Sequence, residues 1–554
     1  MATQFTVKER SRLQKELAGK QLDLLVIGGG ITGAGIALDA QSRGIDTVVI
    51  EMQDFAAGTS SRSTKLVHGG LRYLKQLEIG LVAEVGKERA IVYENGPHVT
   101  TPEWMLLPII PGGSLGRFAT SIGLKVYDFL AGVKKSERRR MLTKQEALHK
   151  EPLLRKGDLK GAGYYVEYRT DDARLTLEVL KKAVSLGAKA FNYMKAEELL
   201  YEDEKLVGVQ VRDLLTDETF HLKAKKIVNA TGPWVDELRE KDGSKKGKTL
   251  HWTKGVHIVV DQKRFPLRQA VYFDTSDGRM VFAIPRDGKT YIGTTDTDYK
   301  KDLVHPRVTK EDRDYLIRAA NHMFPEVRLK AEDVEAFWAG IRPLIHEEGK
   351  SPSEISRKDE IFHSETGLIT IAGGKLTGYR KMAEKVVDLI AKELKEETGK
   401  SYPGCRTDQI AISGGEVGGS RGWISFLEQK QQKGMEIGLT SKESVRLAKL
   451  YGSNVDEVFA WVVRGGQEAE RFGVPLSIYA SVMYGIENES VAKPVDYFIR
   501  RTGAMFFNIH WVKEWKEPVL TLMKEKLGWS QSQLDVYTKE LEEEIVFATE
   551  VVDS

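Results

Sequence analysis

The sequence DLLVIGGGITGAGIALDA, residues 23–40, contains the glycines that decide the fold. Residues 23–30 form an apolar run ending in glycines, which is typical of a buried strand, and residues 31–44 place small and apolar side chains at helical spacing. IDTVVIE, residues 45–51, predicts a second strand. This order predicts a β-α-β unit that opens a doubly wound α/β domain.

The pattern Gly28-x-Gly30-x-x-Gly33 at the junction of strand and helix indicates a dinucleotide site. The first glycine permits a tight turn, the second lets backbone N–H groups approach a pyrophosphate, and the third allows the helix to pack closely on the strand. Glu51, at the end of the second strand, is placed to accept hydrogen bonds from ribose hydroxyls. An acidic residue there argues against a 2′-phosphate.

NAD and FAD are both compatible with this unit, but later segments favour FAD. KKIVNATG (225–232) is an apolar strand running into Ala-Thr-Gly, and IAGGKLTGYRK (371–381) joins a strand, two glycines and a helix start. The hydroxyl-rich loop GTSSRSTK (58–65) is suited to lie along pyrophosphate and ribitol. Taken singly, the Ala-Thr-Gly segment is also compatible with an ordinary turn and the loop with a solvated one. The predicted cofactor contacts are Gly28, Gly30, Ile31, Thr32, Gly33, Glu51, Thr59, Ser60, Ser61, Ser63, Lys65, Leu66, Ala230, Thr231, Gly232, Gly374, Lys375, Leu376 and Thr377.

Composition limits the classes of function that fit. The chain has 554 residues, 41% of them apolar, and a formal net charge of +3, which gives little support to a nucleic-acid partner. Its single cysteine, Cys405, excludes an intramolecular disulfide and fits a reducing compartment, so we expect a cytoplasmic location. The charged N-terminus lacks a secretory signal, and no apolar run approaches the ~20 residues that span a bilayer.

The sequence predicts two large regions. Residues 1–400 are expected to form a FAD-binding domain interleaved with an α+β substrate domain at roughly 80–160 and 250–335. After Pro403 and Gly404 strand-like runs become rare, and residues 401–554 are expected to form an α-helical domain. Its amphipathic helices are compatible with covering the flavin domain, with a homodimer interface, or with docking on a membrane.

Eight motifs in order resemble the family of FAD-dependent glycerol-3-phosphate dehydrogenases, respiratory enzymes that pass electrons to quinone. The resemblance covers roughly residues 20–390. It implies a two-dinucleotide-fold FAD domain of the amino-acid-oxidase type, an inserted substrate domain, and oxidation of sn-glycerol 3-phosphate to dihydroxyacetone phosphate. The motifs are GGGITGAGIALDA, STKLVHGGLRYL, RTDDARL, NATGPWVD, KGVHIVV, IGTTDTDY, GIRPL and GGKLTGYRK.

The resemblance also implies roles for histidines and a first set of substrate contacts. Oxidation of a secondary alcohol is helped by a base that titrates near neutral pH, and histidine is the natural candidate. A lone strand histidine is more often structural, but the family pattern directs His257 toward the substrate, so it is our first candidate and His68 the second. Arg72 and Tyr73 are expected at the substrate phosphate. Arg342 is expected to polarise the C2 oxygen or to bind phosphate, since the guanidinium fork contacts two oxygens.

The remaining expectations concern Arg357, Lys375 and the segment RTDDARL. Arg357 is a further candidate for phosphate, with an exposed loop arginine as the alternative, and Lys375 is expected near flavin and substrate. Asp171 and Arg174 in RTDDARL are interpreted as a capped helix start rather than a site. Scattered histidines and the absence of Cys-x-x-Cys or His-x-x-x-His predict no metal site.

The segment 114–140 raises the question of membrane contact. Its apolar residues fall on one helical face, and a basic cluster follows at 134–140. A helix resting on an anionic membrane surface, on the inner face of the cytoplasmic membrane, and a helix buried against the domain are equally compatible with this pattern.

Three other functions remain open on the same fold. A glycerol-3-phosphate oxidase would use oxygen and release hydrogen peroxide, and we expect such enzymes to carry an extra insertion that is not evident here. An amine or amino-acid oxidase would need a carboxylate clamp, whereas the spread arginines suit a phosphate better. A flavin-binding module without catalysis would leave the array of polar residues at 68, 72, 257 and 342 without a purpose.

Overall fold

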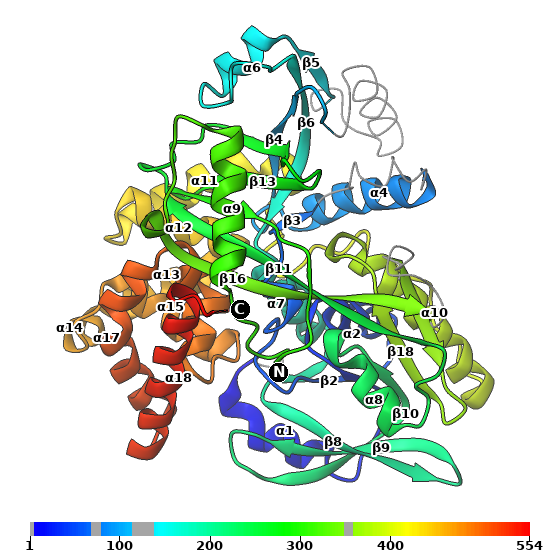
Figure 1. The fold of residues 1–554 in the computed structure, drawn as a ribbon. Coiled ribbons are helices and arrows are strands. Elements are labelled where there is room, and N and C mark those ends of the chain that lie inside the picture. Colours follow the sequence, from blue (N-terminus) through cyan, green and yellow to red (C-terminus); the bar gives the residue numbers. More distant parts are fainter. Residues whose placement is uncertain (1–4, 68–78, 114–137, 348–357, 554) are drawn as a thin grey trace.

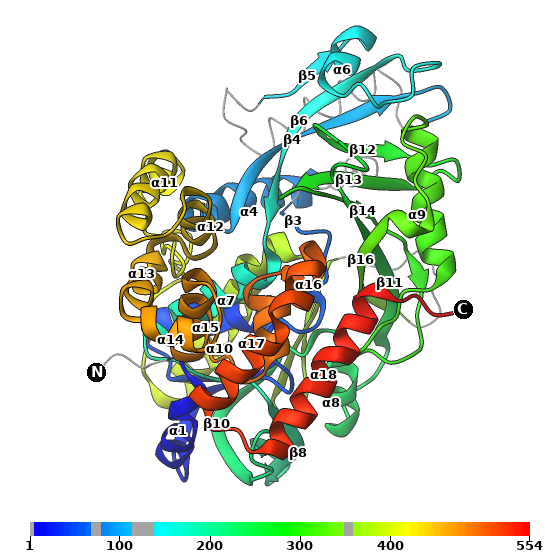
Figure 2. The ribbon, with the colours of Figure 1, turned by 90° about the vertical axis from the view of Figure 1, so that its left-hand side faces the viewer.

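The computed structural model describes residues 5–67, 79–113, 138–347 and 358–553. Two β-sheets form its centre, one in the lower and one in the upper half of Figure 1, and helices cover both. The C-terminal helices lie along one side of the two sheets, as Figure 2 shows.

Sheet A contains the predicted β-α-β unit. β1 (Gln21–Ile27) and β2 (Thr47–Ile50) are parallel neighbours joined by α2 (Ile31–Ser42), which confirms that prediction. β10 (Thr219–Asn229) lies parallel to β1 on its other side, so the Gly28 turn and the segment after Asn229 leave the sheet at the same edge. In the described residues the sheet is completed by β7 (Lys189–Phe191), β8 (Met194–Glu202), β9 (Lys205–Asp213), β17 (Asp359–His363) and β18 (Leu368–Gly373).

Sheet B is largely antiparallel, and its long strands bring distant segments together. β11 (Lys248–Asp261) pairs along its length with β16 (Val334–Glu347), placing His257 opposite Trp338 and Thr253 opposite Arg342. The strands before and between them are β3 (Leu66–Val67), β4 (Thr100–Ile109), β5 (Arg140–Leu142), β6 (Gly161–Thr170), β12 (Ala270–Asp274), β13 (Met280–Arg286), β14 (Lys289–Gly293) and β15 (Thr297–Asp298). The sheet thus draws on strands from Leu66 to Glu347, and our division into domains stays a prediction.

Helices in the first 400 residues pack on both sheets. α7 and α10 cover sheet A beside α2, and α9 lies on sheet B. Asp171 accepts a hydrogen bond from the backbone N–H of Arg174 at 3.1 Å, which confirms the predicted capped start of α7. The helices are α1 (Arg10–Leu17), α4 (Ile79–Asn95), α6 (Lys144–Lys150), α7 (Asp172–Ser185), α8 (Val235–Lys241), α9 (Lys310–Met323) and α10 (Tyr379–Thr398).

The C-terminal region is helical from Gly419 to Thr549 and shares its core with sheet B. Phe506 and Phe507 pack against Trp338 of β16, and α18 also lies against that strand (Figure 2). Buried apolar contacts, here and in a second cluster that includes Leu447, Phe459 and Tyr484, stabilise the amphipathic helices predicted for this region. They are α11 (Gly419–Glu436), α12 (Ser441–Tyr451), α13 (Val455–Arg464), α14 (Gly466–Arg471), α15 (Leu476–Asn488), the π-helical turn η9 (Asp496–Arg501), α16 (Ala504–Phe507), α17 (Ile509–Leu527) and α18 (Gln531–Thr549).

A buried ionic cluster, which we call the Asp54 cluster, fastens the C-terminal region to the loop after β2. Both carboxylate oxygens of Asp54 accept hydrogen bonds from Arg501, at 2.6 and 2.9 Å, and one also accepts from Arg500. Asn192 donates to Asp54 at 3.0 Å, and Arg500 also pairs with Asp496 at 2.9 Å. Burial alone would raise the pKa of Asp54, but the two guanidinium charges hold that pKa well below its ordinary value.

We predict that Asp54→Asn lowers the free energy of unfolding by about 3–5 kcal/mol, because it removes the buried carboxylate that two buried guanidinium groups share, although Arg500 keeps its pair with Asp496. Since the folded-state pKa of Asp54 is below 3.8, this contribution is present above that pH and is lost as the pH falls below it. Denaturant titration followed by tryptophan fluorescence measures the difference. The control, Asp456→Asn, removes an exposed pair with Lys430 and Lys433 and should cost less than about 1 kcal/mol. Equal losses in the two variants would contradict the prediction.

Candidate active site

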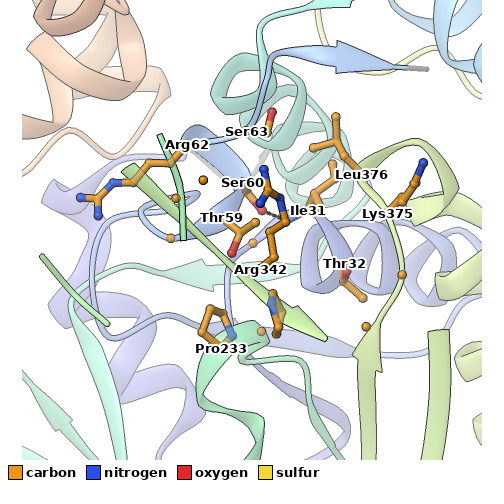
Figure 3. A pocket seen from close by; sticks show the side chains of 18 of the residues that line it. Ile31, Thr32, Thr59, Ser60, Arg62, Ser63, Pro233, Arg342, Lys375 and Leu376 are labelled. Atoms are coloured by element: carbon orange, nitrogen blue, oxygen red, sulfur yellow. Dashed lines mark hydrogen bonds between the residues drawn. The ribbon is translucent and has the colours of Figure 1, made fainter. Parts of the chain in front are cut away.

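A cavity of about 830 Å³ lies between sheets A and B. It is lined by the turn after β1, the loop after β2, the segments after β10, β14 and β18, and strands that include β11, β13 and β16. Its volume is within the range of sites for large ligands. Figure 3 shows the labelled side chains around it: Ile31, Thr32, Thr59, Ser60, Arg62, Ser63, Pro233, Arg342, Lys375 and Leu376.

The glycine turn after β1 is built for close backbone contact. Gly28 has φ +116°, and a Cβ added there would lie 2.4 Å from the carbonyl oxygen of Ala230. A Cβ at Gly33 would lie 1.9 Å from the Gly28 carbonyl oxygen, so this glycine allows α2 to pack on the turn, as predicted. Gly33 itself does not line the cavity, whereas Gly28 and Gly30 do. The turn therefore presents bare backbone at the N-terminus of α2, which fits a pyrophosphate.

Glu51 lies at the carboxyl end of β2 and is held by backbone donors. Its carboxylate accepts hydrogen bonds from the N–H groups of Gly29 and Gln53, both at 2.8 Å. Burial raises the pKa of Glu51, and these two hydrogen bonds oppose the rise. A carboxylate fixed at the cavity surface fits the ribose end of a dinucleotide.

Most residues of the loop 58–65 line the cavity, but Ser61 and Lys65 do not. The Ser60 hydroxyl accepts a hydrogen bond from the Ile31 N–H at 3.0 Å, so the loop is tied to the start of α2. The Lys65 ammonium pairs with Asp172 at 2.7 Å and donates to the Ser61 carbonyl at 2.8 Å. Lys65 and Ser61 do not line the cavity, since the Asp172 carboxylate draws the ammonium into the protein, and their role as cofactor contacts stays a prediction.

Two further segments reach the cavity where the sequence predicts. Ala230, Thr231 and Gly232 follow β10, and the Thr231 hydroxyl donates to Asn229 at 2.7 Å. After β18, Gly374 has φ +77° and precedes three other predicted contacts, Lys375, Leu376 and Thr377, all of which line the cavity. In Figure 3 the Lys375 side chain lies on the opposite side of Arg342 from Arg62.

His257 lies on β11 in an enclosed part of the cavity wall. Its side chain is buried, with the residue 1% exposed, and its ring stacks on Trp338 with centroids 4.7 Å apart. A Cβ at Gly293 of β14 would lie 2.1 Å from the ring, so this glycine provides the space that the ring occupies. Burial, then the charges of Arg342 and Lys65, lower the pKa of His257 well below 6.5. The imidazole is therefore neutral at physiological pH and able to accept a proton.

Arg342 on β16 occupies space provided by another glycine. A Cβ at Gly255 of β11 would lie 2.4 Å from its guanidinium, and Gly255 and His257 are two residues apart, on the same face of the strand. The guanidinium donates to Thr294 and Asp296, both at 3.0 Å. Its side chain is 28% exposed and lines the cavity. A neutral imidazole and a fixed cation thus line the same cavity.

Sequence reasoning missed several lining residues. Arg62, Thr64 and Arg279 line the cavity, as do Lys195 on β8 and Lys241 at the end of α8. Thr64 and Arg62 belong to the loop that was identified as a whole, but no periodic pattern shows which of its side chains face inward. His68, Arg72, Tyr73 and Arg357, and most of the segment 114–140, lie outside the described residues.

The described part of the chain lacks two kinds of feature. It contains no group of three or more His, Cys, Asp or Glu side chains that could hold a metal ion. None of its helices is both long enough and apolar enough to cross a membrane.

Comparison with known proteins identifies the family. A family model described as FAD dependent oxidoreductase matches residues 23–380, and one described as C-terminal domain of alpha-glycerophosphate oxidase matches residues 405–534. The aerobic glycerol-3-phosphate dehydrogenase of Bacillus subtilis (strain 168) is 62% identical over 541 residues, which are 98% of this chain and 98% of the relative.

Solved structures agree. An X-ray structure of the glycerol-3-phosphate dehydrogenase from Bacillus halodurans complexed with FAD is 55% identical, has a TM-score of 0.86 and covers 99% of each chain. Glycine oxidase from Bacillus cereus ATCC 14579, at 20% identity and TM-score 0.51, covers 67% of this chain and 98% of its own and shares the fold alone. The predicted fold class and FAD cofactor are confirmed. The chain therefore belongs to the FAD-dependent oxidoreductases, in the family of aerobic glycerol-3-phosphate dehydrogenases.

Proposed function

We propose that this enzyme oxidises sn-glycerol 3-phosphate at C2 to dihydroxyacetone phosphate and passes the electrons to a membrane quinone. The proposal is supported by the presence of a neutral His257 and the Arg342 guanidinium in the cavity that also contains the dinucleotide turn. FAD, when bound, supplies the acceptor for the hydride that leaves C2.

The chain's own residues would bind the substrate and remove its proton. Arg342 is already oriented by Thr294 and Asp296, so binding an anionic oxygen costs little side-chain entropy. Lys375, at the end of β18, would add a second positive charge. His257 would accept the hydroxyl proton, since its low pKa keeps it neutral before the reaction. Arg72, Tyr73 and Arg357 remain proposed phosphate contacts, and His68 the second candidate for the base.

The electron acceptor separates the two candidate functions. The adjective "aerobic" in the relatives' name is compatible with quinone, whereas the match of residues 405–534 to a domain described from alpha-glycerophosphate oxidase favours oxygen as the alternative. We prefer quinone and, with it, peripheral attachment to the inner face of the cytoplasmic membrane. A homodimer stays an open proposal, with the C-terminal helices as the candidate interface. The membrane proposal fails if the protein does not cosediment with anionic vesicles at low salt.

Anaerobic mixing of the yellow holoenzyme with glycerol 3-phosphate should bleach the visible flavin band within the time of one turnover. Recovery of the band should then be slow in air and fast with a soluble quinone, and stopped-flow absorbance measures both rates. Fast recovery in air with release of peroxide would instead establish the oxidase. A band that does not bleach would overturn the substrate assignment.

Arg342→Ala should lower kcat/KM for glycerol 3-phosphate by about 10²- to 10³-fold, because a charge-assisted contact to the substrate is lost from a largely buried site. If the guanidinium binds the phosphate, activity with glycerol, which lacks that group, should change much less. If it polarises the C2 oxygen, kcat/KM should fall by a similar factor for both substrates. Arg318→Ala, on the exposed face of α9, is the control and should match the wild type. Wild-type kinetics in Arg342→Ala would exclude Arg342 from both roles.

A further inference from the structure

The two ring nitrogens of His257 differ in their hydrogen bonding. Its Nδ1 is buried and has no hydrogen-bond partner in the part of the chain that the structure describes. Its Nε2 lies 3.0 Å from the hydroxyl oxygen of Thr64. Trp338 stacks on one face of the ring, and a Cβ at Gly293 would lie 2.1 Å from the ring atom Cδ2, so β14 packs closely on the imidazole. The Thr64 hydroxyl is the side-chain hydrogen-bond partner of this imidazole among the described residues, so a proton can reach the ring through it.

Thr64 is held in place by the two aromatic residues that flank His257. The Tyr291 hydroxyl donates to the Thr64 carbonyl oxygen at 3.1 Å, and the Trp338 indole N–H donates to the neighbouring Ser63 carbonyl at 3.1 Å. Trp338 in turn packs against Phe506 of α16, with centroids 5.4 Å apart. The threonine backbone and the imidazole ring are therefore fixed against the same aromatic group, which keeps the Oγ1–Nε2 distance short.

Thr64 also lines the cavity. His257 lines it too, but it is 1% exposed whereas Thr64 is half-buried, so the threonine is the more accessible of the two. A hydroxyl donates one hydrogen bond and accepts up to two, so it can donate to Nε2 while accepting from a substrate hydroxyl. The nearby hydroxyl of Thr294 is committed elsewhere, because it accepts from Arg342 and donates to the Thr295 carbonyl.

We propose that Thr64 relays the substrate proton to His257. The inference rests on the proposed role of His257 as base. In the relay the substrate O–H proton moves to Thr64 Oγ1 as the Thr64 proton moves to His257 Nε2. One proton is transferred in total, no electrons move between these groups, and the threonine ends the step as a neutral hydroxyl.

The charges around the imidazole fit a base that holds its proton briefly. The positive charges of Arg342 and Lys65 act on His257, and each cation is paired with a carboxylate, Asp296 and Asp172 respectively. The two cations disfavour the imidazolium, so the proton is released again after product formation. The proton can leave His257 through the Thr64 hydroxyl, the same group through which it arrived.

Thr64→Val keeps the β-branched shape and removes the hydroxyl, whereas Thr64→Ser keeps the hydroxyl. The rate of anaerobic flavin reduction by glycerol 3-phosphate should fall about 10²-fold or more in Thr64→Val and stay within a few-fold of wild type in Thr64→Ser. The KM for substrate and the affinity of the apoprotein for FAD should stay within a few-fold in both. The matched control is Thr290→Val, which also removes a threonine hydroxyl and should reduce the flavin at the wild-type rate. Thr290 lies on β14, its buried hydroxyl donates to the Phe265 carbonyl, and it does not line the cavity.

His257→Gln separates the relay from the base. If both proposals hold, His257→Gln is as slow as Thr64→Val and the double variant is no slower than either, since the two residues act as one unit. Histidine-labelled holoenzyme gives a readout independent of turnover: the ¹⁵N resonance of His257 Nε2 should shift in Thr64→Val and return in Thr64→Ser. A slow His257→Gln with a fast Thr64→Val would overturn the relay alone. A fast His257→Gln would overturn the base and the relay together, and a Thr64→Val defect confined to KM would make Thr64 a binding residue.

Discussion

The contact between the turn after β1 and the end of β10 is the constraint on which the rest of the structure depends. Only a residue without Cβ fits at Gly28, because the Ala230 carbonyl lies where a side chain would begin, and only such a residue fits at Gly33, against the Gly28 carbonyl. The two contacts fix α2 on sheet A and leave its N-terminus bare. Glu51 joins the same turn through the Gly29 N–H. The cofactor end of the cavity thus follows from backbone packing rather than from charged side chains.

Glycines also shape the reactive end, where sheet B carries the functional side chains. Gly255 and Gly293 provide the space for Arg342 and His257, and the pairing of β11 with β16 brings Trp338 beside the imidazole. The C-terminal helices contact this end of the site through Phe506 and Phe507, which pack against Trp338. They are also fastened to the loop after β2 through the Asp54 cluster. This packing gives the helical tail a role in ordering the site, which its amphipathic pattern alone did not reveal.

The parts that the sequence predicted are those that depend on local pattern. The spacing of glycines and apolar residues predicted β1, α2 and β2, and it placed Glu51 at the carboxyl end of β2. The loss of strand-like runs distinguished the helical tail from the mixed α/β part. His257 and Arg342 were singled out through family resemblance, because a strand histidine carries no periodic signal of function. Thr64 was not singled out, and the pairing of Lys65 with Asp172 was not foreseen, for the same reason: their partners, His257 and Asp172, are more than 100 residues away, and only the tertiary pairing decides which side chain lines the cavity.

The most direct test of the account is a crystal structure of the holoenzyme with glycerol 3-phosphate, trapped under anaerobic conditions after reduction of the flavin. The account predicts that the substrate lies in the cavity between the two sheets, with one of its oxygens bonded to Arg342 and its C2 hydroxyl within about 3.2 Å of Thr64 Oγ1 or His257 Nε2. A substrate bound away from all three side chains, with its C2 hydroxyl facing other groups, would contradict the proposed chemistry.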